Sequence, residues 1–255
     1  MIFTRSIDLN ADLAEHDGDS FAHDDAILDV VSSASIACGA HAGSPVVMRQ
    51  TIASAYTKGV SIGAHPGYPD REGFGRRESK LSITAIGDSV AAQIEQLLDC
   101  CAAEGAKLVY VKPHGALYNR AMKDAELSAE LVKRIAAIDD SLIILTLPKS
   151  ALARISIVMG LSIAREAFID RAYLPDGKLV PRSESGAVIH EVDAAASRAV
   201  EMARDHRVMA IDGTEIGIDA QSFCVHGDSI HALQTVTEAR RRLEAAGFSI
   251  ETFAR

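Results

Sequence analysis

The feature that most constrains the fold is a regular alternation of short apolar runs with longer segments of helical period. The apolar runs are three to six residues long and rich in β-branched residues, which predicts strands. They cover residues 5–9, 34–38, 60–64, 108–111, 142–147, 161–165, 208–211, 223–225 and 248–252. The chain is therefore expected to contain many short strands spread over its whole length.

The segments between the strands predict helices over residues 24–32, 44–57, 84–104, 125–137, 191–204 and 229–246. In the segment 84–104 the apolar residues recur every three or four positions, which predicts a helix with one apolar stripe facing the core. Gly105 follows at the position where a helix end favours positive φ. Asp228 or Ser229 is expected to cap the last helix, and Gly247 to end it.

Repetition of strand and helix seven or eight times in 255 residues is typical of a parallel α/β protein. A closed barrel and an open doubly wound sheet both fit this pattern. We favour a β/α barrel, because polar residues that follow several of the strands would converge on one face of a barrel. We expect a single domain over residues 1–255, because no linker or internal repeat divides the chain.

Composition excludes several classes of function. The net charge of −9 disfavours nucleic-acid binding, which depends on clustered Lys and Arg. No apolar stretch approaches the ~18 residues that span a bilayer, and the first residues lack the pattern of a signal peptide. A cytoplasmic protein is expected. The four cysteines have no CxxC spacing, so neither a zinc ribbon nor a redox pair is indicated.

Residues able to do chemistry follow the carboxyl ends of several predicted strands. In a parallel barrel these ends converge on one face, where the strand-to-helix loops build the site. The run "KLVYVKPHGALYN" is an example, since a buried strand ends abruptly in Lys112 and His114. The others are Asp8, Asn10, Asp12 and Glu15 in the first unit, His41 and His65 in the second and third, Glu166, Asp170 and Arg171 after the sixth, and His226 and Asp228 near the end.

Each of these residues also has a structural explanation. A single His after a strand is commonly a hydrogen-bonded loop residue, and Asp228 could be only a helix cap. Asp8 and Asp12 could satisfy the backbone of a turn. Four histidines at the same relative position of their units favour a functional site. Cys38 and Cys224 are weak candidates for nucleophiles, because nothing in the sequence indicates an activated thiol.

Two kinds of chemistry fit this set. Asp and His can hold a divalent metal, for which Asp12, His41 and His114 are the candidate ligands, or they can act as general acids and bases. Lys112 could stabilise an oxyanion, and "DREGFGRR" offers Arg71, Arg76 and Arg77 as a carboxylate or phosphate clamp. No GxxxxGK[ST] loop is present, which excludes a P-loop, and a dinucleotide site is disfavoured.

The sequence resembles the lactam-utilisation (LamB/YcsF) family, the A subunits of bacterial 5-oxoprolinase. The resemblance runs in family order from residue 7 to about 233 and depends on several motifs together. These are "IDLNADLAE", "SSASIACGAHAGS", "GVSIGAHPGYPDREGFGRR", "VKPHGALYN", "FIDRAY", "LVPRSESGAVI" and "CVHGDSIHAL".

The resemblance implies a distorted (β/α) barrel of about seven strands, similar to those of glycoside hydrolases and deacetylases. It implies ATP-dependent cleavage of 5-oxo-L-proline to L-glutamate, with ATP as cofactor and B and C subunits as partners. Asp8, Asp12, His41, His65, Lys112 and His114 are expected to be catalytic. Asn10, Glu15, Arg71, Arg76, Tyr118, Asp170, Arg171, Arg182, His226 and Asp228 are expected to bind substrate or phosphate.

The chain departs from the usual family pattern at Ala14, Ala40, Ser44, Ile169 and Ala172, which leaves the exact substrate open. Two alternatives also remain at this stage. One is a metal-dependent amide hydrolase or deacetylase of the same barrel type. The other is a non-catalytic subunit that stabilises its partners, in which replacement of His114 or Asp12 by Ala would leave the activity of the complex intact.

Overall fold

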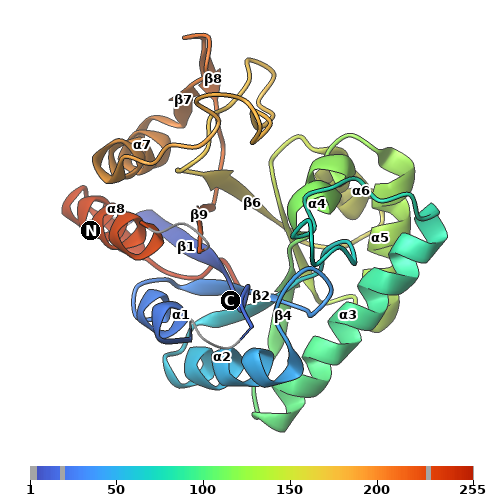
Figure 1. Cartoon of the computed structure of the whole chain (residues 1–255). Coiled ribbons are helices and arrows are strands. Elements are labelled where there is room, and N and C mark those ends of the chain that lie inside the picture. Colours follow the sequence, from blue (N-terminus) through green and yellow to red (C-terminus); the bar gives the residue numbers. More distant parts are fainter. Residues whose placement is uncertain (1–4, 18–20, 228–230, 255) are drawn as a thin grey trace.

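Strands and helices alternate around a closed barrel (Figure 1). The computed structural model describes residues 5–17, 21–227 and 231–254. Seven parallel strands close the barrel in the order β1-β2-β3-β4-β5-β6-β9, with β9 pairing back to β1. They are β1 (Arg5–Leu13), β2 (Ser33–Ala37), β3 (Ser61–His65), β4 (Leu108–Val111), β5 (Ile143–Thr146), β6 (Ile163–Phe168) and β9 (Ser222–His226). The predicted barrel of about seven strands is confirmed.

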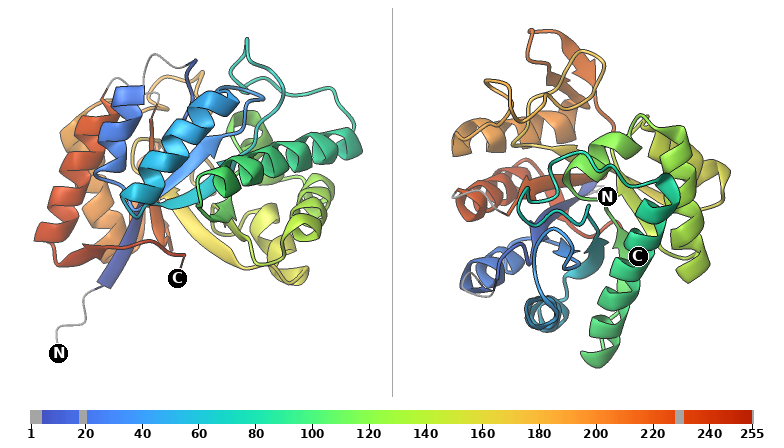
Figure 2. Two further views of the ribbon diagram at one scale, coloured as in Figure 1. Left: turned by 90° about the horizontal axis from the view of Figure 1, so that it is seen from below. Right: turned by 45° about the vertical axis from the view of Figure 1, so that its right-hand side comes forward.

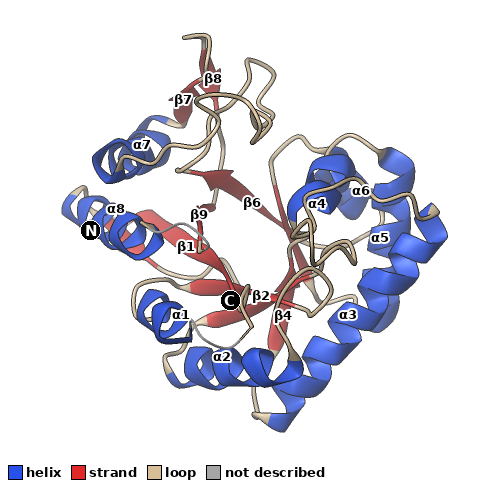
Figure 3. Ribbon diagram, viewed as in Figure 1, coloured by secondary structure: helices blue, strands red, loops and turns tan. Residues whose placement is uncertain are grey.

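Helices form a ring outside the strands (Figure 3). They are α1 (Phe21–Leu28), α2 (Pro45–Thr57), α3 (Ile83–Ala103), α4 (Gly115–Ala121), α5 (Ala125–Ile138), α6 (Ala151–Val158), α7 (Val192–Asp205) and α8 (Ala232–Ala245). In α3 the predicted apolar stripe is buried. Among the described residues, no helix has the length and apolar character needed to cross a bilayer.

The strand predicted over residues 208–211 is present but lies outside the barrel. This segment overlaps β7 (Arg207–Met209), which pairs antiparallel with β8 (Glu215–Gly217) in a separate two-stranded sheet. Figure 1 shows this small sheet outside the ring of helices. An apolar run of four residues does not reveal its pairing partner, so periodicity alone could not separate a strand of this hairpin from a barrel strand. The strand near residue 248, β10 (Phe248–Ile250), extends the sheet beside the start of β1.

Two short helices, α4 and α6, were not predicted, because seven or eight residues carry too little periodicity. Ser150 caps α6 by accepting a hydrogen bond from the amide of Ala153. The last helix, α8, is described from Ala232 onward. Its expected caps Asp228 and Ser229 lie outside the described residues.

Strand β1 is longer than predicted and continues to Leu13. Its sequence alternates strictly, so Leu9, Ala11 and Leu13 belong to one side and the polar residues Asp8, Asn10 and Asp12 to the other. The polar side faces the interior of the barrel, where Asn10 donates to Ser222 Oγ at 2.6 Å. The acidic residues therefore lie on the strand itself and not in a loop after it.

The lower part of the barrel interior is polar and fully buried. Asp8 accepts hydrogen bonds from the hydroxyls of Ser32, Ser33 and Ser222. Above it, Ser35 contacts the hydroxyl of Tyr110 at 3.2 Å. The Tyr110 ring occupies the space beside Gly63, where an added Cβ would lie 2.1 Å from the ring. This packing closes the barrel below the site.

Candidate functional site

The site lies at the mouth of the barrel, where the loops after β1, β2, β3 and β4 meet. The left view in Figure 2 shows long loops gathered at the end of the barrel opposite the start of β1. Each of four loops or strand ends contributes one side chain: Glu15, His41, His65 and His114. Ala14 adopts φ 60° just before Glu15, and this left-handed residue turns the chain back over the mouth.

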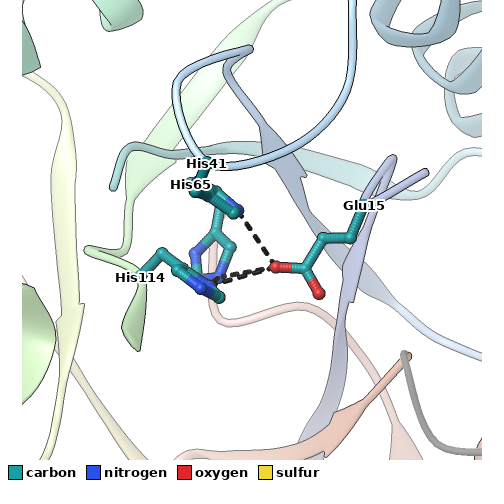
Figure 4. Close-up of side chains that lie close together, drawn as sticks. All are labelled: Glu15, His41, His65 and His114. Carbon is teal, nitrogen blue, oxygen red and sulfur yellow. Dashed lines mark hydrogen bonds and ion pairs between the residues drawn. The ribbon is translucent and has the colours of Figure 1, made fainter. Parts of the chain in front are cut away.

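The three imidazoles and the carboxylate form one compact group (Figure 4). Glu15 Oε1 lies 3.1 Å from His41 Nε2, 3.0 Å from His114 Nδ1 and 3.8 Å from His65 Nε2. The His41 and His114 rings stack in parallel with centroids 3.8 Å apart. All three histidines are buried, so these contacts form away from bulk water.

The loop between β3 and α3 packs its backbone directly against these rings. A Cβ added to Gly67 would lie 2.6 Å from His41 Nδ1, and one added to Gly75 would lie 2.9 Å from both His41 and His114. Glycine at these two positions therefore permits the close approach that holds the imidazoles in place.

Backbone carbonyls fix the orientation of two rings. His65 Nδ1 lies 2.8 Å from the carbonyl of Lys112, and His114 Nε2 lies 2.9 Å from the carbonyl of Phe74. A carbonyl oxygen only accepts, so each of these ring nitrogens donates. The remaining nitrogens, His65 Nε2 and His114 Nδ1, are 3.0 Å apart and face Glu15. In the neutral rings His65 Nε2 and His114 Nδ1 each carry a lone pair. Two lone pairs at this distance repel each other unless a proton or a metal cation lies between them.

Charge in the group is concentrated on the carboxylate. Burial would raise the pKa of Glu15, but the neighbouring His114 and His41 hold it well below its ordinary value. Burial lowers the pKa of His41 to about 4, so that ring is neutral near pH 7. His41 Nδ1 has no hydrogen-bond partner in the described part of the chain.

This donor set fits a divalent metal. One ligand atom from each of Glu15, His41, His65 and His114 lies within 4.8 Å of the other three. Three imidazoles with a carboxylate suit zinc and similar ions, and hydrogen bonds from the outer ring nitrogens to carbonyls are typical of metal-bound histidines. Asp12 Oδ2, 3.4 Å from His65 Nε2, lies next to this set.

Below the histidines, Lys112 lies in the barrel interior with its ammonium fully engaged. Lys112 Nζ contacts Asp12 Oδ1 at 2.8 Å, Glu166 Oε2 at 3.1 Å and Asn10 Oδ1 at 3.2 Å. Burial would lower the pKa of Lys112, but Asp12 and Glu166 raise it well above its ordinary value. Its hydrogens are directed at protein acceptors, so the structure places it in an internal charge network.

At the ends of β9 and β6, His226 and Asp170 form a dyad. His226 Nδ1 lies 2.9 and 3.1 Å from the two carboxylate oxygens of Asp170, which also accepts the His226 amide at 3.1 Å. The His226 ring stacks on Phe168 at 5.3 Å. Burial would raise the pKa of Asp170, but His226 lowers it below its usual range. The carboxylate thus fixes the imidazole in orientation.

A pocket of about 400 Å³ connects these groups. Its wall includes Asp12, His65, Lys112, His114, Tyr118 and His226, together with three arginines, Arg76, Arg171 and Arg182. The hypothesis that polar residues far apart in the sequence gather at one rim of the barrel is confirmed in its geometry.

Several predicted site residues lie elsewhere. Asp8 is on the floor of the barrel with its three serines. Arg71 binds Asp17 and the carbonyls of Gly39 and Gly43, so it ties two loops together. Arg77 pairs with Asp70 and Glu72. Asp228 lies outside the described residues.

The structure also adds two residues that the predicted set lacks, because Phe168 and Asn119 line the pocket. Glu166, which the strand-end pattern singled out, pairs with Lys112 beneath the pocket. Phe168 resembles any other apolar residue at a strand end, and its stacking on His226 has no signal in the sequence.

The thiols are unsuited to nucleophilic attack. Burial raises the pKa of Cys38 to about 12 and raises that of Cys224 well above its ordinary value. Both therefore stay protonated near neutral pH, and thiolate is the reactive form.

Comparison with known proteins agrees with this picture. The profile of the LamB/YcsF family matches residues 7–255. A 5-oxoprolinase A subunit of Agrobacterium fabrum is 47% identical over 98% of this chain and 98% of its own. The 5-oxoprolinase A subunit of Pyrococcus abyssi is 44% identical over 96% of both chains.

Solved structures give the same result at the level of the fold. A lactam utilization protein from Thermus thermophilus superposes with a TM-score of 0.90 and 40% identity, covering 97% of this chain and 100% of the other. The catalytic domain of a peptidoglycan N-acetylglucosamine deacetylase from Eubacterium rectale gives a TM-score of 0.55 at 10% identity, over 99% and 90% of the two chains. The second likeness shows a shared barrel fold alone.

Proposed function

The chain belongs to the LamB/YcsF family, and from that premise we propose that it is the A subunit of an ATP-dependent 5-oxoprolinase. In this proposal it works in the cytoplasm with B and C subunits and opens 5-oxo-L-proline to L-glutamate. The observation that carries the proposal is the group of Glu15, His41, His65 and His114, two of whose histidines line a pocket together with His226 of the His226–Asp170 dyad.

Ring opening of a lactam adds water to the carbonyl carbon and breaks the C–N bond. The water must lose a proton, and the leaving nitrogen must gain one. Because amide opening to glutamate is uphill, coupling to ATP is required; phosphorylation of the amide oxygen activates the carbon. Water attack and C–N cleavage then give γ-glutamyl phosphate, which a second water hydrolyses to glutamate and phosphate.

Asp12 supplies the base side of this reaction. Its carboxylate lines the pocket, is hydrogen-bonded to Lys112 and lies next to His65, so it can orient a water and accept its proton. Beside it, Glu15, His65 and His114 converge with a carboxylate oxygen and ring nitrogens that are suited to holding the metal described below.

His226 supplies the acid side. Asp170 binds Nδ1 and so leaves Nε2 as the nitrogen directed away from the dyad, where it can give a proton to the departing lactam nitrogen. The stacked Phe168 keeps the ring from rotating. The proposed base Asp12 and the proposed acid His226 come from the neighbouring strands β1 and β9, and both line the same pocket.

A divalent metal held by Glu15, His41, His65 and His114 is part of the proposal. When bound there, it would polarise the carbonyl and activate water. Metal analysis of the purified protein tests this directly. Stoichiometric metal that is lost in His65→Ala but retained in His190→Ala, an exposed histidine outside the pocket, is the expected result.

The function is tested by ADP release and glutamate formation from 5-oxo-L-proline, with this chain alone and with its B and C partners. We expect equal amounts of ADP and glutamate from the mixture, and a loss of at least about 10²-fold in His114→Ala, with His190→Ala unaffected. Absence of substrate-dependent ADP in both mixtures refutes the proposal. Full activity in His114→Ala would instead support a non-catalytic, stabilising role.

A second candidate is a metal-dependent amide hydrolase or deacetylase that needs no ATP. The observation in its favour is the metal-fitting donor set on a barrel shared with deacetylases. Zinc bound in equal amount to protein, together with hydrolysis in the absence of ATP and partners, would favour this candidate over the first.

A further inference from the structure

We infer that the arginine side of the pocket, formed by Arg76, Arg171 and Arg182, binds the carboxylate of the substrate and so restricts the enzyme to carboxylated lactams. This inference rests on the proposed function and names the substrate feature that the same pocket selects. It follows from how these three cations are placed and from the groups that surround them.

Arg171 is a buried cation held by neutral groups. Its side chain is 5% exposed, and it donates from Nε to the carbonyl of Ala187 at 3.1 Å and from Nη2 to the carbonyl of Val180 at 2.6 Å. Asp170 is adjacent, but His226 engages both of its oxygens. Buried charges in proteins are normally paired, so Arg171 at the pocket wall is suited to an anionic ligand.

Arg182 adds a second cation on the same wall. Within the described parts of the chain it forms neither an ion pair nor a hydrogen bond, although it lies near Asp170 and Arg171. Burial lowers the pKa of Arg171 to about 10, and the charge of Arg182 contributes to that shift. An anion between the two guanidinium groups would relieve their repulsion.

Arg76 connects this side to the histidines. Its guanidinium lies 4.8 Å above the ring of Phe74, and the Phe74 carbonyl accepts the hydrogen bond of His114. Arg76 and His114 therefore lie on the same part of the pocket wall, and a small ligand can contact both.

The acidic and basic side chains around the pocket are distributed in a way that suits the charge distribution of the proposed substrate. Asp12 and Glu15 lie beside the histidines, whereas Arg171 and Arg182 lie beside Asp170. In 5-oxoproline the reacting carbonyl and the carboxylate are on opposite sides of the ring nitrogen. The acidic end repels the carboxylate and the arginines attract it, so one orientation presents the carbonyl to the histidines. Planar guanidinium groups match carboxylates in paired hydrogen bonds.

The test compares binding of 5-oxo-L-proline with that of 5-oxo-L-prolinamide, a neutral analogue of nearly equal shape. Calorimetry on the full chain measures both dissociation constants without needing turnover. We expect wild type to prefer the carboxylate by about ten- to a hundredfold, the range of charged hydrogen bonds. Arg182→Met should reduce this preference to within a few-fold of unity, and Arg76→Met should reduce it by a smaller factor.

The matched control is Arg154→Met, an exposed arginine on α6 that donates to the carbonyl of Lys149 outside the pocket. It should keep the wild-type preference. Arg182 makes no bonds within the described fold, so its removal should leave the thermal midpoint unchanged and separate binding from folding.

Two results overturn the inference. In the first, Arg182→Met and Arg76→Met both keep the wild-type preference for the carboxylate. In the second, inorganic phosphate binds wild type more tightly than 5-oxo-L-proline does and loses that affinity in Arg182→Met, which assigns the arginines to a phosphoryl group. Failure of the proposed function gives a different result. In that case calorimetry still shows the preference for the carboxylate, but the protein forms no glutamate when it is mixed with its partners.

Discussion

Replacement of Lys112 by Met is the sharpest test of the charge network under the site. Lys112 is 1% exposed and is the cation between Asp12 and Glu166, at 2.8 and 3.1 Å. Methionine preserves most of the volume of the aliphatic chain but removes the charge. The two carboxylates would then be buried close together with no counterion, which strongly destabilises a fold.

The loss of folding free energy in Lys112→Met depends on the two carboxylates that are left without a counterion. Breaking a buried ion pair from one side costs about 3–5 kcal/mol, a large part of the ~5–15 kcal/mol that stabilises a typical domain. Burial already raises the pKa of Glu166, so protonation of Glu166 limits the cost in the variant. Adding Glu166→Gln removes one of the two stranded charges and should recover about 1–2 kcal/mol.

Denaturant unfolding at pH 7 measures these differences in the single and double variants. The double-mutant cycle of Lys112 and Glu166 should give a coupling free energy above about 1 kcal/mol. A Lys112→Met variant within about 1 kcal/mol of wild type, or a double variant less stable than the single one, would refute the reasoning. The first outcome would mean that water reaches the carboxylates.

Three further predictions concern the barrel and its mouth. The pKa of Asp8 is raised by burial to about 6, so the folded state holds this proton more tightly than the unfolded state. Stability should therefore fall as pH rises from about 4 to 6, by up to about 3 kcal/mol, and Asp8→Asn should abolish that part of the fall in unfolding titrations. Gly63→Ala should lower the thermal midpoint by several degrees, because its Cβ meets the Tyr110 ring at 2.1 Å; an unchanged midpoint contradicts the packing. Ala14→Gly should raise stability by up to about 1 kcal/mol, because φ 60° strains alanine; a clear loss in denaturant unfolding would argue against strain.

Local signals made most of the fold predictable from the sequence. Strand β4 has the predicted bounds 108–111, and α3 lies within one or two residues of its prediction. Ser44, one of the departures from the expected family pattern, caps α2 by accepting from the amide of Val47. Serine is a favoured residue for this task, so local structure is preserved at this position. The elements that could not be predicted are three to eight residues long. Their structure depends on the segments against which they pack or pair, more than on the propensity of their own residues.

The histidine group was predictable because a parallel barrel brings strand ends together. The role of Glu15 within it was not, because its approach to the histidines depends on the left-handed turn at Ala14. Arg71 and Lys112 were expected to face an anion, and both are engaged by protein groups. A sequence shows the type and position of a charge but not the partner that folding assigns to it.

The buried polar residues are better understood as one connected column than as separate exceptions to an apolar core. Asp8 accepts from Ser222, Ser222 accepts from Asn10, and Asn10 accepts from Lys112. Lys112 in turn donates to Asp12, which lies beside His65 at the mouth. Each link satisfies a group that would be costly to bury alone. Because the column is continuous from the floor to the pocket, it fixes Asp12 and His65 before any ligand arrives. A change at the floor that keeps the fold, such as Asp8→Asn, should therefore also alter activity at the mouth.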